Sequence, residues 1–193
     1  MNDTTDWTPS PEDNKLGLSD KNLINEFEAK GIAIAELSIF DLDIESEISV
    51  QLILEIHRIA FSELYKWAGK WRTTNVSVGN LIPPEPARII QLIYQFVDTL
   101  NYKLANAKTI EEHIDCLAYA HYEFIRIHPF NNGNGRTGRM LMNLIALKFG
   151  YKPLELYHRE GEGRKIYINA LREADKGNSA PLINLIRKEL IPF

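Results

Sequence analysis

The sequence predicts an all-α fold with one small β element. Apolar residues recur every three or four positions through most of the 193 residues, which is the spacing of amphipathic helices. β-branched and polar residues alternate only over residues 72–78, and the chain offers no other strand with which a parallel sheet could form. The sequence has no internal repeat, so we expect the helices to pack around one core.

The first two helices are predicted from their apolar stripes. One lies near residues 20–29, where Ser19 is the expected N-cap and Gly31 the expected break. Its apolar face comprises Leu23, Ile24 and Phe27. The next extends from about Ser46 to Tyr65, and its stripe leaves out His57. That stripe consists of Ile48, Leu52, Ile56, Ile59, Ala60 and Leu64.

A short strand or hairpin is expected after the second helix. Residues 72–78 have the alternation of a strand, and Gly79 and Asn80 can turn the chain. The prolines between residues 83 and 86 donate no backbone hydrogen bond, so they end the element. We therefore predict a small β-hairpin between two helical segments.

The remaining helices are predicted near residues 87–104, 110–127, 136–150, 163–175 and 179–190. Cys116 falls in one of these apolar stretches, so we expect a buried and inert thiol. A chain of this length suits one domain, which we place at residues 18–193. The acidic and polar residues 1–17 are predicted to form a flexible tail.

Composition excludes several classes of protein. The formal net charge of −4 gives no reason to expect nucleic acid as a partner. No run approaches the ~20 apolar residues of a membrane span, and the N-terminus has no apolar signal segment. We therefore expect a cytoplasmic protein with no membrane partner. A single cysteine excludes an internal disulfide and a zinc site built from clustered cysteines.

The stretch HPFNNGNGRTGR, residues 128–139, contains a GxGxxG run. A dinucleotide-binding fingerprint of that form needs a preceding strand, whereas helical periodicity precedes this run. A Walker A loop needs a lysine that the stretch lacks. The run is therefore predicted to be a glycine-rich turn between two helices.

This turn has the features of an anion site. Glycines let backbone N–H groups converge, and a helix N-terminus adds unpaired donors and a positive dipole end. Arg136 and Arg139 oppose that dipole unless a polyphosphate binds there. The alternative is a plain helix connection whose arginines pair with surface acids. His128 favours the site, because its imidazole could act as a general base. The other histidines are interpreted as structural: His57, His113, His121 and His158.

The stretch resembles the Fic motif, commonly written HPFx(D/E)GNGRxxR, and differs from it at one fixed position. The resemblance extends over roughly residues 45–190. YKWAGKWRTTNVSVGNLIPPEPARI is similar to the segment that bears the family's target-docking flap, and YINALREADKGNSAPLINLI to its closing helices. The resemblance implies a Fic-like helical bundle with a small β-hairpin flap.

Fic domains typically transfer AMP from ATP to a protein hydroxyl, usually with Mg²⁺. The resemblance implies that His128 deprotonates a Ser, Thr or Tyr of a target protein and that Phe130 anchors the loop. It places the nucleotide on Asn132, Gly133, Asn134, Gly135, Arg136, Arg139, Tyr167 and Asp175, the last two at the adenine and ribose. The flap residues are Thr73, Thr74, Asn75, Val76 and Ser77. Their exposed edge could hold the target segment through backbone hydrogen bonds, or the flap could simply cover the core.

Asn132 stands where the family has Asp or Glu to hold Mg²⁺. A neutral amide offers an oxygen but no charge, so metal affinity should fall. The sequence thus predicts a protein adenylyltransferase that either transfers AMP slowly or uses another nucleotide donor. A nucleotide-binding regulatory module with little chemistry is the alternative.

Inhibition is expected to come from outside the chain. Many family members carry an inhibitory helix with (S/T)xxxE(G/N), and here only Thr8–Glu12 fits the first five positions, with two interior prolines. Arg139 is therefore predicted to be free for nucleotide, or blocked in trans by a small inhibitory partner. A homo-oligomer is left open.

Overall fold

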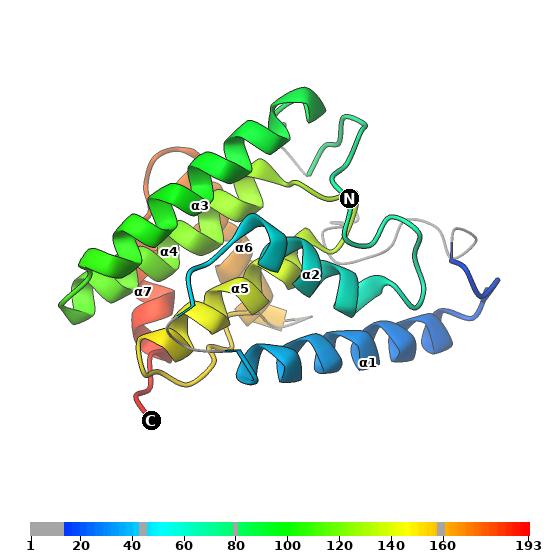
Figure 1. Cartoon of the computed structure of the whole chain (residues 1–193). Coiled ribbons are helices and arrows are strands. Elements are labelled where there is room, and N and C mark those ends of the chain that lie inside the picture. Colours follow the sequence, from blue (N-terminus) through cyan, green and yellow to red (C-terminus); the bar gives the residue numbers. More distant parts are fainter. Residues whose placement is uncertain (1–13, 43–45, 79–80, 158–160) are drawn as a thin grey trace.

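A computed structural model of the protein describes residues 14–42, 46–78, 81–157 and 161–193 (Figure 1). Within these residues the regular structure is helical, which confirms the predicted all-α class. The α helices are α1 (Lys21–Phe40), α2 (Val50–Phe61), α3 (Ile89–Asn106), α4 (Ile110–Ile127), α5 (Asn134–Lys148), α6 (Gly161–Asp175) and α7 (Ala180–Glu189). A 3-10 turn, η2 (Pro86–Arg88), precedes α3.

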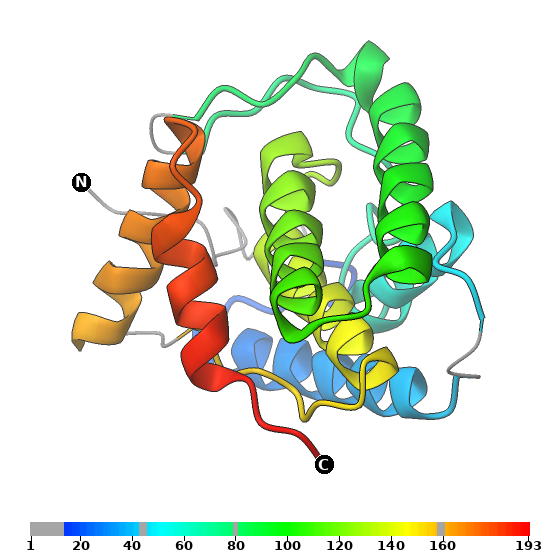
Figure 2. The ribbon, with the colours of Figure 1, turned by 90° about the vertical axis from the view of Figure 1, so that its left-hand side faces the viewer.

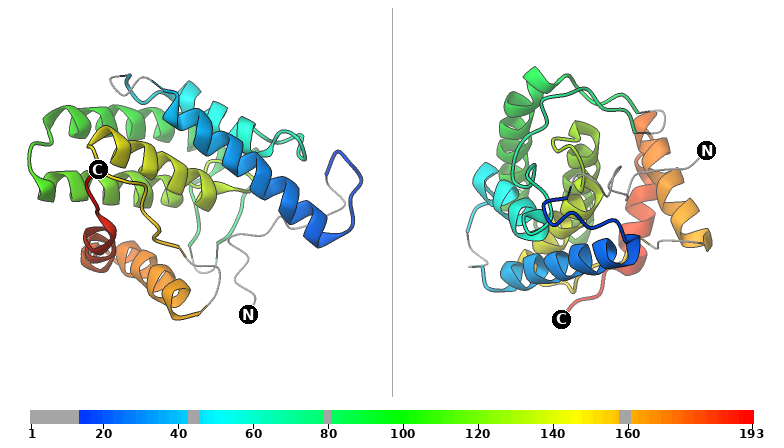
Figure 3. Two further views of the ribbon diagram at one scale, coloured as in Figure 1. Left: turned by 90° about the horizontal axis from the view of Figure 1, so that it is seen from below. Right: turned by 90° about the vertical axis from the view of Figure 1, so that its right-hand side faces the viewer.

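Helix α4 lies at the centre of the bundle. It packs against α3 on one side and α7 on the other, and α6 packs on α7 (Figure 2). Helices α1 and α2 pack on each other and both contact α5 (Figure 3). Buried apolar side chains from all seven helices form one core. The turn from α4 into α5, which carries the glycine-rich stretch, therefore lies within the packed part of the molecule.

Helix α1 differs from the prediction at both ends. Its N-cap is Asp20 and not Ser19, because the Asp20 carboxylate accepts a backbone N–H of the first turn at 2.8 Å. Gly31 does not break the helix: a Cβ there would lie 2.2 Å from the carbonyl oxygen of Ala60, so the glycine allows α1 and α2 to touch. Leu23, which we expected on the buried face, is 42% exposed. The buried positions are Ile24, Glu28, Gly31, Ala35 and Ile39.

The predicted β-hairpin does not form. Over the described part of residues 72–84, Val78 and Leu81 pair in one isolated antiparallel bridge, and Thr73–Ser77 make no strand. Alternating β-branched residues favour a strand only when a neighbouring strand can pair with them, and the described residues supply none. Gly79 and Asn80, the expected turn, lie outside the described residues. We call residues 72–84 the flap.

Two further sequence predictions concern the N-terminal residues and the cysteine. The last residues of the expected flexible tail contact the segment after α2: Asn14 is 7% exposed, and the backbone N–H of Lys15 donates to the Leu64 carbonyl at 2.6 Å. Cys116 is buried as predicted, and burial raises the pKa of its thiol to about 12.

In the part of the chain that is described, no helix has the length and apolarity needed to cross a bilayer.

Candidate functional site

His128 ends α4 and turns the chain into the glycine-rich loop. It is the C-cap residue, with φ 50° and ψ 59°, and its N–H donates to the Phe124 carbonyl at 3.0 Å. No other described non-glycine residue has a positive φ, a conformation that is often found at functional sites. Burial lowers the pKa of His128 to about 4, and the positive charge of Arg72 contributes less. The imidazole is therefore neutral at pH 7 and able to accept a proton.

Phe130 and His57 hold the loop on α2. The Phe130 ring is fully buried and stacks on the His57 ring, with 3.6 Å between centroids. His57 Nδ1 accepts the Gly69 N–H at 2.8 Å, so Nε2 must carry the proton that it donates to the Asn132 carbonyl at 3.1 Å. Burial lowers the pKa of His57 to about 3, which keeps this ring neutral as well. His57 therefore supports the loop.

Gly133 and Asn134 set the shape of the turn. Gly133 has φ 75°, and a Cβ there would lie 2.6 Å from the Phe61 ring. The Asn134 side chain accepts the Phe130 N–H and donates to the Phe130 carbonyl, both at 2.8 Å. Its side chain thus closes the loop, and only its backbone N–H remains for a phosphate. Among the described residues no side chain caps α5, and the first N–H groups of a helix can bind an anion.

Arg136, expected on a phosphate, points toward α1. Its Nη1 lies 2.6 Å from Glu28 Oε2, and the Tyr65 hydroxyl donates to Glu28 Oε1 at 2.7 Å. The side chains of this ion pair are 10% and 8% exposed. Arg136 Nε and Nη2 are buried and have no hydrogen-bond partner among the described residues. The edge of the guanidinium that could grip two phosphate oxygens is therefore unsatisfied.

Arg139 lies one turn further along α5. Its guanidinium is 4.3 Å from the centre of the Tyr157 ring, and it lines a cavity of about 360 Å³ between α1, α5 and residues 153–157. Glu36 lines the same cavity, where burial raises the pKa of its carboxyl and the Arg139 charge opposes that rise. Thr8–Glu12 lies outside the described residues, so the availability of Arg139 to nucleotide stays a prediction.

The two residues expected at adenine and ribose lie apart from each other. Tyr167 is 3% exposed and shares a hydrogen bond of 2.8 Å with His121 Nε2. Asp175 is exposed at the end of α6 and accepts the Tyr122 hydroxyl at 3.2 Å. The Tyr167 ring meets the Tyr157 ring edge-on, with 5.4 Å between centroids, and Tyr157 lines the cavity between α1 and α5.

The histidines outside the motif were expected to be structural. Like His57 and His121, His113 has a partner inside the fold, the Tyr151 hydroxyl at 3.0 Å from its Nδ1. His158 lies outside the described residues.

The residues around Asn132 do not fit a protein-held Mg²⁺. Asn132 is 8% exposed, and its side-chain oxygen accepts the Gly133 N–H at 2.7 Å. Mg²⁺ prefers charged oxygen ligands in octahedral geometry. Across the described ranges, no group of three or more His, Cys, Asp or Glu side chains is placed to bind a metal. We therefore derive no chemical step through a metal.

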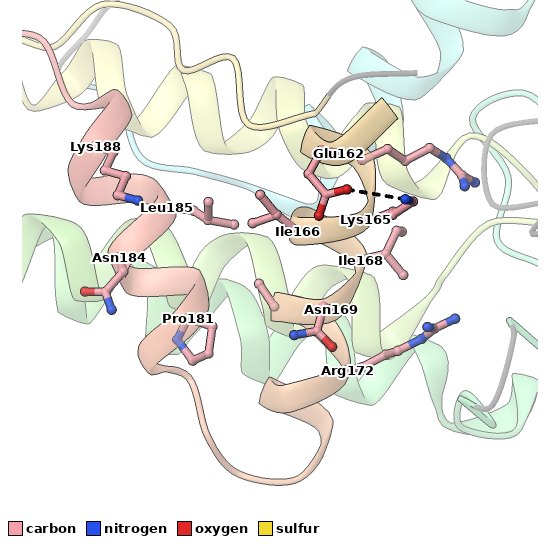
Figure 4. A pocket seen from close by; sticks show the side chains of 12 residues that line it. Glu162, Lys165, Ile166, Ile168, Asn169, Arg172, Pro181, Asn184, Leu185 and Lys188 are labelled. Carbon is pink, nitrogen blue, oxygen red and sulfur yellow. Dashed lines mark hydrogen bonds and ion pairs between the residues drawn. The ribbon is translucent and has the colours of Figure 1, made fainter. Parts of the chain in front are cut away.

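A larger hollow of about 700 Å³ lies between α6 and α7, away from the glycine loop (Figure 4). Ile166 and Leu185 face each other across it, with Arg172 and Lys188 at its margins (Figure 4). It contains none of the residues of the motif.

Comparison with known proteins agrees with the loop geometry. A sequence model of the Fic/DOC family matches residues 47–146, which include α2, the flap, α4 and the whole motif. The chain belongs to the Fic/DOC family. This assignment confirms the resemblance of the motif.

Named relatives of this Fic domain include the protein adenylyltransferase fic-1 of Caenorhabditis elegans. It is 37% identical over 143 residues, which make up 74% of this chain and 27% of that protein. The chain thus spans little more than a quarter of that relative. A solved structure of C. elegans Fic-1 has a TM-score of 0.76 and 30% identity, and covers 89% of this chain and 50% of that one.

A solved structure of the BepC effector of Bartonella tribocorum, with bound AMPPNP, has a TM-score of 0.74. It is 20% identical and covers 100% of this chain and 99% of that one, which shows a shared fold.

Sequence reasoning missed two residues around the motif. Glu28 stands at the buried face of α1, four residues after Ile24, where an acid is unexpected. That position was a usable signal, since a buried carboxylate needs a partner. Arg72 is 2% exposed and bonds to the His128 carbonyl, but nothing in a strand-like segment distinguishes a buried arginine from an exposed one.

Proposed function

We propose that this Fic domain transfers AMP from ATP to the hydroxyl of a Ser, Thr or Tyr in a target protein. The observation that carries the proposal is the short loop that joins His128, at the end of α4, to the N-terminus of α5, a helix that also bears Arg136 and Arg139. The activity named for the C. elegans relative supports the same chemistry.

His128 would act as the general base. It takes the proton of the acceptor hydroxyl, the hydroxyl oxygen bonds to the α-phosphorus, and the bond to the β-phosphate oxygen breaks, releasing pyrophosphate. A pKa of about 4 makes His128 a weak base in the free protein. The negative charge of a bound triphosphate favours the imidazolium, so nucleotide binding should raise this pKa.

Charge on the phosphates would be stabilised by α5. The N–H groups of its first turn point at the loop, and the positive end of the helix dipole favours an anion. Arg136 and Arg139 would neutralise the phosphate oxygens, Arg136 through its unsatisfied Nε–Nη2 edge. Asp175 is proposed for the ribose, and Tyr167 would shape the adenine pocket from within.

The flap would hold the target. Thr73, Thr74, Asn75 and Ser77 are exposed, Val76 is half-buried, and no strand of this fold pairs with them in the described residues. A target segment could therefore bond to their backbone. Deleting residues 73–77 should abolish target modification while leaving nucleotide binding intact, and unchanged modification would mean that the flap only covers the core.

A nucleotide-binding regulatory module is the second candidate. It is favoured by Asn132, which brings no charge to a metal, and by Glu28, which already neutralises Arg136. Mg²⁺ would then have to enter with the triphosphate, and transfer would be slow.

Labelled ATP, GTP, CTP and UTP, each with Mg²⁺ or Mn²⁺, distinguish the two candidates. The wild type is expected to label itself or proteins of a lysate, and intact mass identifies the group transferred. In His128→Ala the rate of transfer should fall at least ~100-fold, whereas the nucleotide affinity should stay within about threefold of the wild-type value. Nucleotide binding without transfer by the wild type and by Asn132→Asp would favour the regulatory module.

A further inference from the structure

Arg72 is a buried charge beside the candidate active site. It is 2% exposed, and it is the largest of the fully buried side chains in the described residues. Within the described ranges no carboxylate pairs with it, and burial lowers the pKa of its guanidinium. A buried charge without a counter-ion is stabilised only by its hydrogen bonds, so the groups that receive those bonds indicate what the residue does.

The acceptors of Arg72 come from three places in the chain. Nε donates to the His128 carbonyl at 2.7 Å, Nη1 donates to the Thr74 carbonyl at 2.9 Å, and Nη2 donates to the Pro84 carbonyl. The backbone N–H of Arg72 donates to the Pro129 carbonyl at 2.9 Å. One side chain thus joins the beginning of the flap, its end and the residue proposed as the base.

The geometry of these bonds requires a guanidinium. Its planar fork directs Nε, Nη1 and Nη2 along fixed directions in one plane, whereas the ammonium of a lysine is a single point charge at the end of a flexible chain. His128 also needs such support, because a left-handed φ of 50° is unfavourable for a residue other than glycine. A bond to its carbonyl oxygen restrains that peptide.

We propose that Arg72 is a positioning residue that ties both ends of the flap to the backbone of His128. The tie keeps the base and the target segment in register, so that an acceptor hydroxyl held by the flap lies within reach of the imidazole. This inference rests on the proposed function of His128. The charge of Arg72 also helps to keep His128 neutral, since it lowers the pKa of that ring.

Arg72→Met, Arg72→Lys and Leu100→Ala test the tie. Leu100→Ala is the control for a general loss of stability. Leu100 is fully buried in the second half of α3, so its truncation destabilises the core but changes no residue of the flap or the motif. The Tm of Leu100→Ala shows how much cleavage and activity change when stability alone falls. Thermolysin cleavage under native conditions reports on the flap, because Leu81 and Ile82 are cleavable there and Ile82 is 85% exposed. Transfer kinetics report on the base.

Arg72→Met is expected to be cleaved in the flap about tenfold faster than Leu100→Ala of similar Tm. Its kcat should fall roughly 100-fold with the nucleotide KM within about threefold, because misplacing the base affects the chemical step more than binding. Arg72→Lys keeps the charge and most of the volume, so it should recover part of the resistance to cleavage and part of the kcat. Should Arg72→Met not fold, the comparison of Arg72→Lys with Leu100→Ala takes its place.

Equal cleavage and equal kcat in Arg72→Met and Leu100→Ala would overturn the tie and leave Arg72 as part of the core. Cleavage does not depend on transfer. If the wild type shows no transfer but loss of Arg72 still speeds cleavage, the proposed function fails and the tie between flap and motif stands.

Discussion

The Arg136 guanidinium of the motif bonds to the Glu28 carboxylate of α1, across 108 positions of sequence and with 2.6 Å between Nη1 and Oε2. Helix α1 lies before the segment that the family model matches, so an element outside that segment neutralises an arginine of the motif. Tyr65 completes the contact by donating to the same carboxylate.

Glu28→Gln should destabilise the fold. Removing one partner of a buried pair leaves an uncompensated charge, which costs roughly 3–5 kcal/mol of unfolding free energy. Urea denaturation measures the change. The control is Glu111→Gln, because Glu111 and Arg187 form an ion pair whose side chains are 64% and 45% exposed. That pair should contribute far less to stability, because water screens exposed charges, and equal losses in the two variants would contradict the importance of burial.

Asn132→Asp should strengthen metal-dependent transfer. A carboxylate near a cation attracts it by about 1–4 kcal/mol, depending on the effective dielectric, so Mg²⁺ affinity should rise on the order of tenfold or more. Transfer measured across a Mg²⁺ titration checks this. Asn131→Asp adds the same charge at the neighbouring exposed position, and a similar gain there would mean that the effect is not specific to position 132.

Gly133→Ala should distort the loop. The left-handed φ of 75° costs about 1–2 kcal/mol for alanine, and the contact of 2.6 Å with the Phe61 ring adds roughly 1–3 kcal/mol of overpacking. Gly150→Ala is the matched control, since Gly150 has φ 81° with open space around a Cβ. Thermal unfolding of both should show the larger loss at Gly133, and nucleotide affinity should fall only there.

Stability should decrease as the pH falls below about 6.5. The pKa of His57 is lowered to about 3, and those of His121 and His128 are lowered to about 4, in each case chiefly by burial. Between about pH 4 and 6.5 the unfolded chain therefore binds more protons than the folded one, so the free energy of unfolding rises with pH. The protein therefore loses stability as the pH falls from about 6.5 to about 4.

His121→Gln tests the contribution of one ring to this slope. Denaturant unfolding between about pH 5 and 6 should show the slope reduced by up to about 1.4 kcal/mol per pH unit. An unchanged slope in His121→Gln would show that His121 does not contribute.

Helical periodicity and the motif were readable from the sequence. The apolar spacing of residues 110–127 reproduces α4 because both ends of that helix depend on local signals, a capping box at Thr109 and Glu112 and the turn at His128. The stretch HPFNNGNGRTGR identified the family and the turn between α4 and α5, because its residue types specify a glycine-rich turn followed by a helix start.

Only the tertiary structure decided which partners these residues have. Gly31 lies inside α1 where Ala60 of α2 touches it, Arg136 turns to Glu28, and no strand of the described residues pairs with the flap. Each of these outcomes depends on which segments the packing places side by side. Local sequence specifies backbone preferences over a few residues, whereas burial, counter-ions and strand pairing depend on contacts between segments far apart in the chain.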